Sequence, residues 1–169
     1  STFKEATEKV HGDDHLTTVV LGKGEHQIDH QYLVIPSAMN IVGDPEVPKE
    51  EIVVVGGIFF GKRIQENCHL QHVTLRQAKE NGVAGYSSFT MEDVLVEQCA
   101  HSGVAAAGTG VVGRCTNVEV RQCGASGVVA GNGAFITLIG AETTVHHNCT
   151  AGNSAYYGLA VYASSSSTI

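Results

Sequence analysis

The sequence predicts an all-β fold in which short parallel strands wind into a coil of about five to six turns, closed at its start by a short helix. Three observations predict it: similar segments recur with a period in the low twenties, no helical pattern separates them, and 20 glycines accompany few aromatic residues. Many glycines and few large side chains suit short strands that are joined by tight corners. Repeats of this length that contain no helix exclude the helical repeat folds and predict a solenoid whose turns stack about 4.8 Å apart.

The composition narrows the class of protein and its partners. The 169 residues are enough for one domain with a core of its own. A formal charge of −7 argues against nucleic acid or an anionic membrane as the partner. No apolar run approaches the roughly 18–20 residues that are needed to cross a bilayer.

The five cysteines are expected to be free. Five thiols cannot all pair with one another, and no C-x-x-C spacing predicts a zinc or redox motif. Buried free thiols indicate a reducing compartment, which slightly favours the cytoplasm, although the sequence leaves the compartment open. The residues are Cys68, Cys99, Cys115, Cys123 and Cys149. No motif predicts a cofactor or a metal ion.

Residues 1–15 are expected to form a capping helix, and residues 16–169 are expected to form the coil. Phe3, Ala6 and Val10 lie at helical spacing. The first turn of a coil exposes unpaired strand edges and an open apolar core, which a short amphipathic helix can cover.

The segments after the helix are expected to be early turns of the same coil. Residues 17–28 and 32–44 have the pattern of short strands broken by Gly and Pro, and 45–51 is a charged loop. The stretch VVVGGIFFGKR (53–63) has the glycine and lysine spacing of a phosphate-binding loop, but Arg63 stands where that loop needs a hydroxyl. Its bulky centre would also keep backbone amides from closing around phosphate. We therefore interpret the stretch as a strand, a Gly-Gly corner and a second strand.

Three copies of the repeat are clear, and a fourth is fainter. Residues 72–88, 93–109 and 117–133 each contain an alternating strand, an amide, a small residue, three turn residues and Gly-Val, and the fourth starts at Thr143. The amides are expected to form a ladder of side-chain hydrogen bonds at a corner that buries them. The amide column is Gln77, Gln98, Gln122 and Asn148; the glycine column five residues later is Gly82, Gly103 and Gly127, with Asn153, which tolerates positive φ, in the fourth copy.

The strands of the repeat predict distinct columns on the inside and the outside of the coil. Val and Leu fill the inward positions 73, 75, 94, 96, 118 and 120. The outward column Arg76, Glu97 and Arg121 alternates in sign, as adjacent strands prefer, and predicts surface ion pairs. We expect His147 to continue this column and His146 to point inward as a neutral, hydrogen-bonded imidazole. A column of small, buried side chains is expected at Ala78, Cys99, Cys123 and Cys149.

The segments VTLRQAKENGV, VLVEQCAHSGV and VEVRQCGASGV carry a resemblance to a known family. Their amide-then-glycine corner resembles the right-handed parallel β-helix repeat of the pectate-lyase-like superfamily, over residues 16–169 and most strongly over 67–133. The resemblance implies a right-handed coil. It also implies that enzymes on this scaffold are chiefly polysaccharide lyases, hydrolases and epimerases.

The repeats depart from the pattern of those enzymes. The N-T-D, D-D, G-H-G and R-I-K motifs of the hydrolase relatives are missing from them, and Asp93 is the only aspartate in residues 67–169. A lyase that holds Ca²⁺ against its substrate needs several carboxylates. We therefore interpret the chain as a member of the superfamily that does not look catalytic.

The favoured hypothesis for function is a non-catalytic repeat domain that acts as a rigid binding or assembly scaffold for a glycan or a protein. Repeat coils offer long faces, and function on them lies in the side chains displayed across successive turns. The expected binding face bears Arg76, Glu97, Arg121 and His147.

Two alternatives stay open. The first is a carbohydrate-active enzyme, such as a polyuronate lyase or epimerase. Its only candidate acid and base groups are His146, Tyr156, Tyr157 and Arg121, with Tyr162 close to them in sequence. The second is a structural module that associates end to end, because the last residues, SSSSTI, contain no capping pattern and favour either further coils or self-association.

Overall fold

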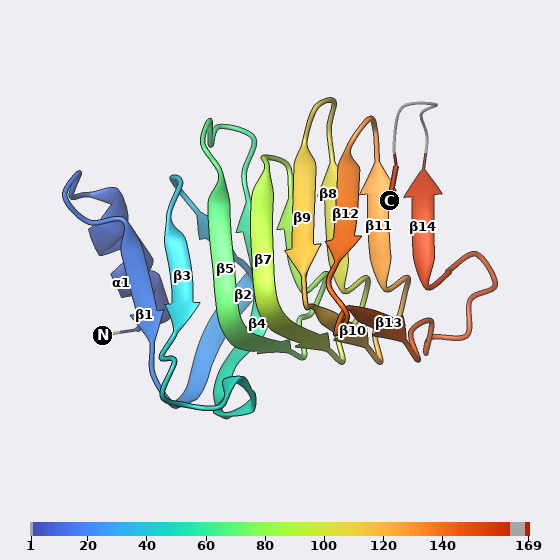
Figure 1. The fold of residues 1–169 in the computed structure, drawn as a ribbon, viewed down its shortest axis with the longest axis horizontal. Helices are drawn as coiled ribbons and strands as arrows, with labels where there is room; N and C mark the ends of the chain where they lie inside the picture. The colour runs from blue at the N-terminus through green and yellow to red at the C-terminus, as the bar shows by residue number, and fades with distance from the viewer. Residues whose placement is uncertain (1, 163–167) are drawn as a thin grey trace.

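The computed structural model describes residues 2–162 and 168–169 and is a parallel β-solenoid of about 5 turns with one N-terminal helix (Figure 1). This confirms the predicted fold class. The elements in chain order are α1 (Phe3–His11), β1 (Thr18–Leu21), β2 (Gly24–Ile35), β3 (Asn40–Gly43), the 3₁₀ turn η1 (Lys49–Glu51), β4 (Ile52–Phe60), β5 (Cys68–Arg76), β6 (Val83–Gly85), β7 (Phe89–Glu97), β8 (Val104–Ala107), β9 (Val112–Thr116), β10 (Glu119–Arg121), β11 (Val128–Gly131), β12 (Phe135–Ile139), β13 (Thr144–His146) and β14 (Leu159–Tyr162).

The strands form three faces, and every pairing between turns is parallel. The first face runs through β1, β3, the first halves of β5 and β7, then β9 and β12. The second face runs through the start of β2 and of β4, the second halves of β5 and β7, then β10 and β13. The third runs through the ends of β2 and β4, then β6, β8, β11 and β14. Each turn therefore contributes one short strand segment to each face.

The corners of the coil are marked by left-handed backbone. At the corner between the first and second faces, His72, Asp93 and Asn117 have φ of 54°, 51° and 52°. At the corner between the second and third faces, the positive φ values belong to Gly56 (136°), Gln77 (55°), Gln98 (56°), Gln122 (57°) and His147 (52°). L-residues rarely adopt this conformation, and a bend of the same kind on every turn keeps the strands in register.

The three glutamines lie over one another, as predicted, but they do not form a buried ladder. The amide of Gln77 donates to Glu97 O at 3.2 Å, and the amide of Gln98 donates to Arg121 O at 3.2 Å. All three glutamine side chains are exposed. The expectation of a buried amide ladder was therefore wrong, and the column is defined by its backbone conformation.

The glycine column has a different cause from the one predicted. Gly82, Gly103 and Gly127 do not have positive φ; instead a Cβ on any of them would overlap a valine side chain of the next turn and the carbonyl oxygen of the next glycine of the column. The fourth member is Gly158, because Val128 pairs with Leu159. The prediction of Asn153 at this position was wrong, since the last corner is longer than those before it.

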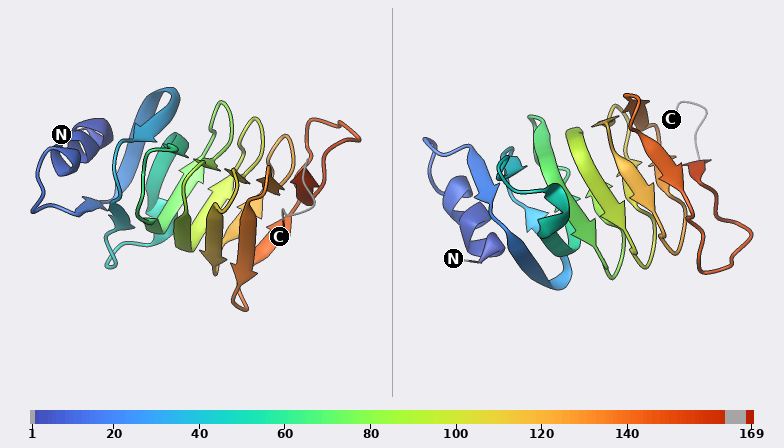
Figure 2. Two further views of the ribbon diagram at one scale, coloured as in Figure 1. Left: turned by 90° about the horizontal axis from the view of Figure 1, so that it is seen from above. Right: turned by 60° about the horizontal axis from the view of Figure 1, so that its bottom comes forward.

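The interior of the coil is apolar and is covered at its start by α1. The six inward Val and Leu positions of the repeat are at most 1% exposed, and Phe60 and Phe89 stack with ring centroids 5.6 Å apart. Thr2 and Glu5 form a capping box that begins α1, and Phe3 and Val10 of this helix are buried. The helix lies beside the first turn of the coil (Figure 2). The stretch 53–63 lies largely in β4, so the interpretation as strand and corner is confirmed.

All five cysteines are free. Cys68, Cys99, Cys115 and Cys123 are buried, and burial raises the pKa of the Cys115 thiol to about 12, which makes it chemically inert. Cys149 is only half-buried and does not continue the cysteine column as expected. Asn148 lies there instead: its Oδ1 accepts from the Cys123 amide at 3.0 Å, and its Nδ2 donates to Val120 O at 3.0 Å.

In the described part of the chain, no helix combines the length and the apolar character needed to cross a bilayer.

Candidate functional site

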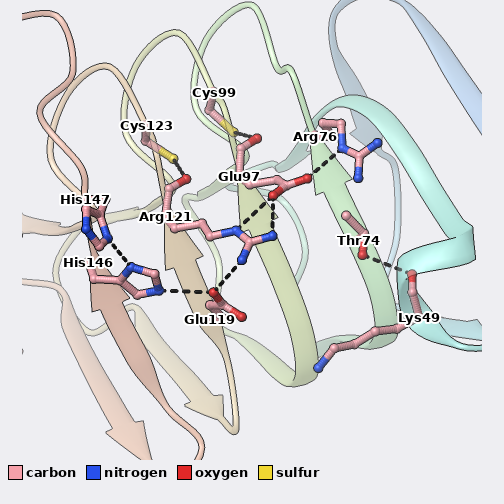
Figure 3. Close-up of polar contacts among 10 residues, drawn as sticks. All are labelled: Lys49, Thr74, Arg76, Glu97, Cys99, Glu119, Arg121, Cys123, His146 and His147. Atoms are coloured by element: carbon pink, nitrogen blue, oxygen red, sulfur yellow. Dashed lines mark hydrogen bonds and ion pairs between the residues drawn. The ribbon is translucent and has the colours of Figure 1, made fainter.

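The predicted column Arg76, Glu97 and Arg121 lies on the outer side of the second face, in adjacent register (Figure 3). Glu97 Oε1 accepts from Arg76 Nε at 2.7 Å, and its Oε2 accepts from Arg121 Nε at 2.9 Å and from an Arg121 terminal nitrogen at 2.8 Å. The Glu97 side chain is only 5% exposed, whereas those of the two arginines are about one-third exposed. The predicted ion pairs of Glu97 with the two arginines are confirmed, but Glu97 is not exposed as expected, because the arginines of the neighbouring turns close over its carboxylate.

Glu97 is held as a carboxylate. Burial alone would raise the pKa of Glu97, but hydrogen bonds from Arg121 and Arg76 outweigh it and hold that pKa below its ordinary value. A carboxylate that accepts three guanidinium hydrogen bonds is a poor base and a poor nucleophile. This geometry is that of a structural cross-link between three turns.

The hydrogen-bonded chain continues from Arg121 to two histidines (Figure 3). Glu119 Oε1 accepts from an Arg121 terminal nitrogen at 3.0 Å and lies 3.0 Å from His146 Nε2, and His146 Nδ1 lies 2.6 Å from His147 Nδ1. His146 pairs with Arg121 in register, so it continues the outward column and is half-buried. His147 occupies the left-handed corner position and is exposed.

Both histidine assignments from the sequence were therefore wrong by one residue. The alignment placed Asn148 in the column of the glutamines, but the backbone places His147 there. Asn148 instead turns inward to satisfy two backbone groups of the preceding turn. An amide can occupy either position, so residue type alone could not fix the register of the fourth copy.

The structure does not connect the three tyrosines to the series of hydrogen bonds that runs from Arg121 to the two histidines. Tyr156 is half-buried, Tyr157 is 57% exposed, and the Tyr162 hydroxyl donates to Ala155 O at 3.3 Å. Within residues 2–162 and 168–169, no hydrogen bond or ring contact links any of the three to His146 or Arg121.

A strap formed by residues 44–51 covers part of the second face. His72 lies with Nδ1 2.6 Å from Asp93 Oδ2 and Nε2 2.8 Å from Val47 O, Lys49 forms an ion pair with Asp93, and the Thr74 hydroxyl donates to Lys49 O at 3.0 Å. Thr74 is fully buried although it points outward. The sequence predicted only a charged loop here and gave no sign that it folds back onto the sheet.

His72 is expected to carry a positive charge in the folded protein. Its two ring nitrogens face a carboxylate and a carbonyl oxygen, which only accept hydrogen bonds, so both nitrogens donate only in the imidazolium form. Burial lowers the pKa of His72 and so does Lys49, but hydrogen bonds to Asp93 and Val47 O and the charge of Asp93 outweigh them, so the pKa is raised.

We expect the strap to loosen as the pH rises. The folded pKa of His72 lies above its unfolded value, so the stabilisation is fully present below about pH 6.5 and is lost as the pH rises through the folded pKa. Amide hydrogen exchange in residues 44–51, corrected for the intrinsic pH dependence of exchange, should show protection that falls over this window. In His72→Gln, protection should be low and independent of pH. Equal protection of the wild-type strap at pH 5.5 and pH 8.5 would contradict the imidazolium assignment.

The third face presents aromatic side chains on three successive turns. Phe59 points outward between the buried Ile58 and Phe60, and its ring centroid lies 5.8 Å from that of Tyr32 and 5.4 Å from that of Tyr86. We call Tyr32, Phe59 and Tyr86 the aromatic ladder. The sequence did not predict it, because Tyr32 pairs with Gly57 and Phe59 pairs with Ala84, so the three rings do not fall in one register column.

A groove of about 530 Å³ begins at the aromatic ladder and is mostly apolar. It is lined by Val34, Ile35, Pro36, Phe59, Gly61, Lys62, Arg63, Ile64 and Tyr86. Lys62 Nζ lies 5.4 Å from the centroid of the Tyr86 ring, within cation–π distance. A concave, largely apolar site with a few polar groups is the usual form of a small-ligand site.

Within the described ranges, no group of three or more His, Cys, Asp or Glu residues is arranged to hold a metal ion.

The fold and these surfaces define the class of protein as a parallel β-solenoid repeat protein. No protein-family model matches the chain, and no curated protein or solved structure matches it either.

Proposed function

We propose that this chain is a non-catalytic β-solenoid that binds a glycan on its third face. The observation that carries the proposal is the aromatic ladder, whose central residue, Phe59, lies on β4 between the paired strands β2 and β6. Aromatic rings that cannot move offer flat apolar surface at little entropic cost, and such surface suits the apolar face of a sugar ring. In this proposal the chain is a member of the pectate-lyase-like superfamily, with residues 1–15 as its cap and 16–169 as its coil.

The charged column of the second face is less suited to bind a ligand than the third face is, because most of its charged groups are already paired. Glu97, Arg121 and Glu119 are engaged with one another, so the column that the sequence analysis assigned to ligand binding has few groups left to offer. The terminal guanidinium nitrogens of Arg76 are the exception, since its Glu97 contact uses Nε. We therefore place the ligand on the third face.

Tyr86→Ala tests the proposal directly. We expect it to weaken binding of any glycan that the wild-type chain retains on a glycan array by about tenfold, because the groove loses half of its aromatic floor. Tyr157→Ala is the matched control, because Tyr157 is exposed and lies outside the groove. Equal losses in both variants, or no glycan retained by the wild type, would contradict the proposal.

The enzyme alternative rests on the hydrogen-bonded series formed by Glu119, His146 and His147. A carboxylate that orients a histidine is a common arrangement for proton transfer. A polyuronate lyase would release unsaturated products that absorb in the ultraviolet, and an epimerase would exchange a sugar C–H with deuterated solvent. Either activity, if lost in His146→Ala, would favour this alternative over the binding role.

The self-association alternative rests on the last turn. Leu159 and Val161 follow the inward positions of β11 in register, yet both are 49% exposed. Sedimentation of the wild type against Leu159→Glu would test it. A concentration-dependent dimer that the substitution abolishes would favour the assembly role.

A further inference from the structure

We infer that the free edge of β2 binds an extended segment of a partner protein, in which apolar residues alternate with basic ones. The inference goes beyond the proposed glycan binding and does not depend on it. Three observations carry it: a strand edge without a strand partner, a cavity between that edge and α1, and carboxylates in the lining of the cavity.

The strand β2 has a partner on one side only. It pairs with β4, and none of the described strands pairs with its other side, which faces the start of the coil. The strands that follow it on the third face, β4, β6, β8 and β11, are each paired on both sides. A strand edge presents a row of backbone donors and acceptors, and an added strand is the usual partner that satisfies them.

The direction of the hydrogen bonds identifies the free groups of this edge. The Ile58 amide donates to Gly82 O, so the backbone of Ile58 faces β6 and not β2. Leu33 lies opposite Ile58 and therefore bonds to the two residues that flank Ile58 on β4. Backbone groups alternate in direction along a strand, so the N–H and C=O groups of Tyr32 and Val34 face away from β4.

The helix α1 covers this edge without bonding to it. In the described part of the chain, no hydrogen bond joins α1 to β2. A cavity of about 720 Å³ separates them, lined by the first residues of α1 and by most of β2 between residues 25 and 34. Phe3 and Leu33 in this lining are buried, so residues of an added strand that point into the coil should be apolar. At about 3.3 Å per residue, an added strand of four residues would span about 13 Å beside the end of β2.

The charges in the cavity favour a basic partner. Glu25 and Asp29 line it, and within residues 2–162 and 168–169 neither forms an ion pair. Lys4 is the one lysine or arginine of the lining, and its ammonium group lies 3.7 Å from a Glu8 carboxylate oxygen on the same helix. Lys or Arg side chains on the outward positions of an added strand would complement the two carboxylates.

A partner segment suits this edge better than a second copy of the chain does. On the third face the other strand with a single partner is β14, which pairs with β11 at the opposite end of the coil. Its sequence, LAVY, contains no basic residue to meet Glu25 and Asp29. We therefore favour a partner protein, and pairing between copies becomes one of the outcomes of the test.

The test uses a blocked octapeptide of alternating valine and lysine and its counterpart of alternating valine and glutamate. Two further forms of the lysine peptide are N-methylated, one at every valine and the other at every lysine. In an extended strand the amides of the valines and of the lysines point to opposite edges, so only one of the two forms loses its hydrogen bonds to β2. Binding to the wild-type chain is measured by titration calorimetry at low and high salt.

Val34→Pro removes one free donor of the edge without removing a bond to β4. Its matched control is Val20→Pro on β1, a strand that likewise has one partner. Asp44 N donates to Leu21 O, so the Val20 amide faces away from β3 in the same manner, and Val20 lies outside the cavity. Both valines have exposed side chains.

The charge variant is Glu25→Gln with Asp29→Asn. Its matched control, Glu92→Gln with Asp14→Asn, removes two exposed carboxylates outside the cavity. If Val34→Pro does not fold, the charge variant and the two N-methylated peptides still decide the result.

We expect the lysine peptide to bind more tightly than the glutamate peptide and to be weakened by salt. One N-methylated form and the Val34→Pro variant should each lose about tenfold or more in affinity, because backbone hydrogen bonds to the edge are lost. The charge variant should lose about threefold to tenfold, as two exposed charge contacts imply. Bound peptide should slow the hydrogen exchange of the Tyr32 and Val34 amides, and both control variants should bind as the wild type does.

Three results would overturn the inference, and none of them bears on glycan binding. Equal affinity for the two N-methylated forms would show that the peptide does not add as a strand. Equal affinity for the lysine and glutamate peptides would remove the basic partner. A dimer that Val34→Pro abolishes and Val20→Pro does not, with no peptide bound, would assign the edge to a second copy of the chain.

Discussion

Replacing Gly103 with alanine is expected to lower the free energy of unfolding by about 2–3 kcal/mol, because the added methyl group overpacks the inside of the coil. A Cβ at Gly103 would overlap Cγ1 of Val120 on the next turn and would lie 2.9 Å from the Gly127 carbonyl oxygen and 3.3 Å from Cys123 Sγ. Val120 is buried and Gly127 O accepts the Val104 amide, so neither can move without breaking the stacking of two turns.

Gly158→Ala is the matched control for this substitution. Gly158 belongs to the same column in register, but a Cβ there meets no atom within 4 Å, because no described residue lies over the last turn at that point. Denaturant unfolding of the two variants and the wild type measures the difference. The explanation by close approach fails if Gly103→Ala is no less stable than Gly158→Ala.

The repeat made the fold predictable because each of its columns has a local physical cause. Inward Val and Leu at alternate positions fix which side of each strand is buried, and the recurring corner fixes the length of a turn. The predicted register of the strands therefore agrees with the structure over residues 72–133, where both signals are present. In the fourth copy the strand is shifted by one residue from the predicted register, so the predictions for His146, His147 and Cys149 were wrong. The last corner is also longer, so the prediction for Asn153 was wrong too.

The candidate site was less predictable because it depends on contacts between turns. Burial of Glu97 follows from two arginines that belong to different turns, and the strap of residues 44–51 is held by His72 and Asp93 from two others. The aromatic ladder combines residues 32, 59 and 86, of which only residue 86 lies in a clear repeat. Outward positions in irregular turns carry no periodic signal, so their proximity appears only in three dimensions.

Replacing Glu97 with glutamine or alanine is expected to lower the free energy of unfolding by about 2–4 kcal/mol, since it leaves Arg76 and Arg121 side by side without their shared counter-charge. The full cost of breaking a buried ion pair is reduced here because both guanidinium groups are about one-third exposed and keep part of their hydration. Glu119→Gln is the control, because Glu119 pairs with the same arginine but is 32% exposed, and its loss should cost less than about 1 kcal/mol.

The pH dependence of the Glu97 effect gives a second measurement. Because the folded pKa of Glu97 lies below its unfolded value, its stabilisation is present above the unfolded pKa and is lost as the pH falls through the folded pKa. The difference in unfolding free energy between wild type and Glu97→Gln should therefore be constant near neutral pH and shrink in acid. An apolar replacement of the whole cluster, Arg76→Met with Glu97→Leu and Arg121→Met, should recover most of the lost stability, because it removes the unpaired charges together. If that triple variant is as unstable as Glu97→Gln, the penalty arises from lost packing, and the cross-link between the turns is not electrostatic.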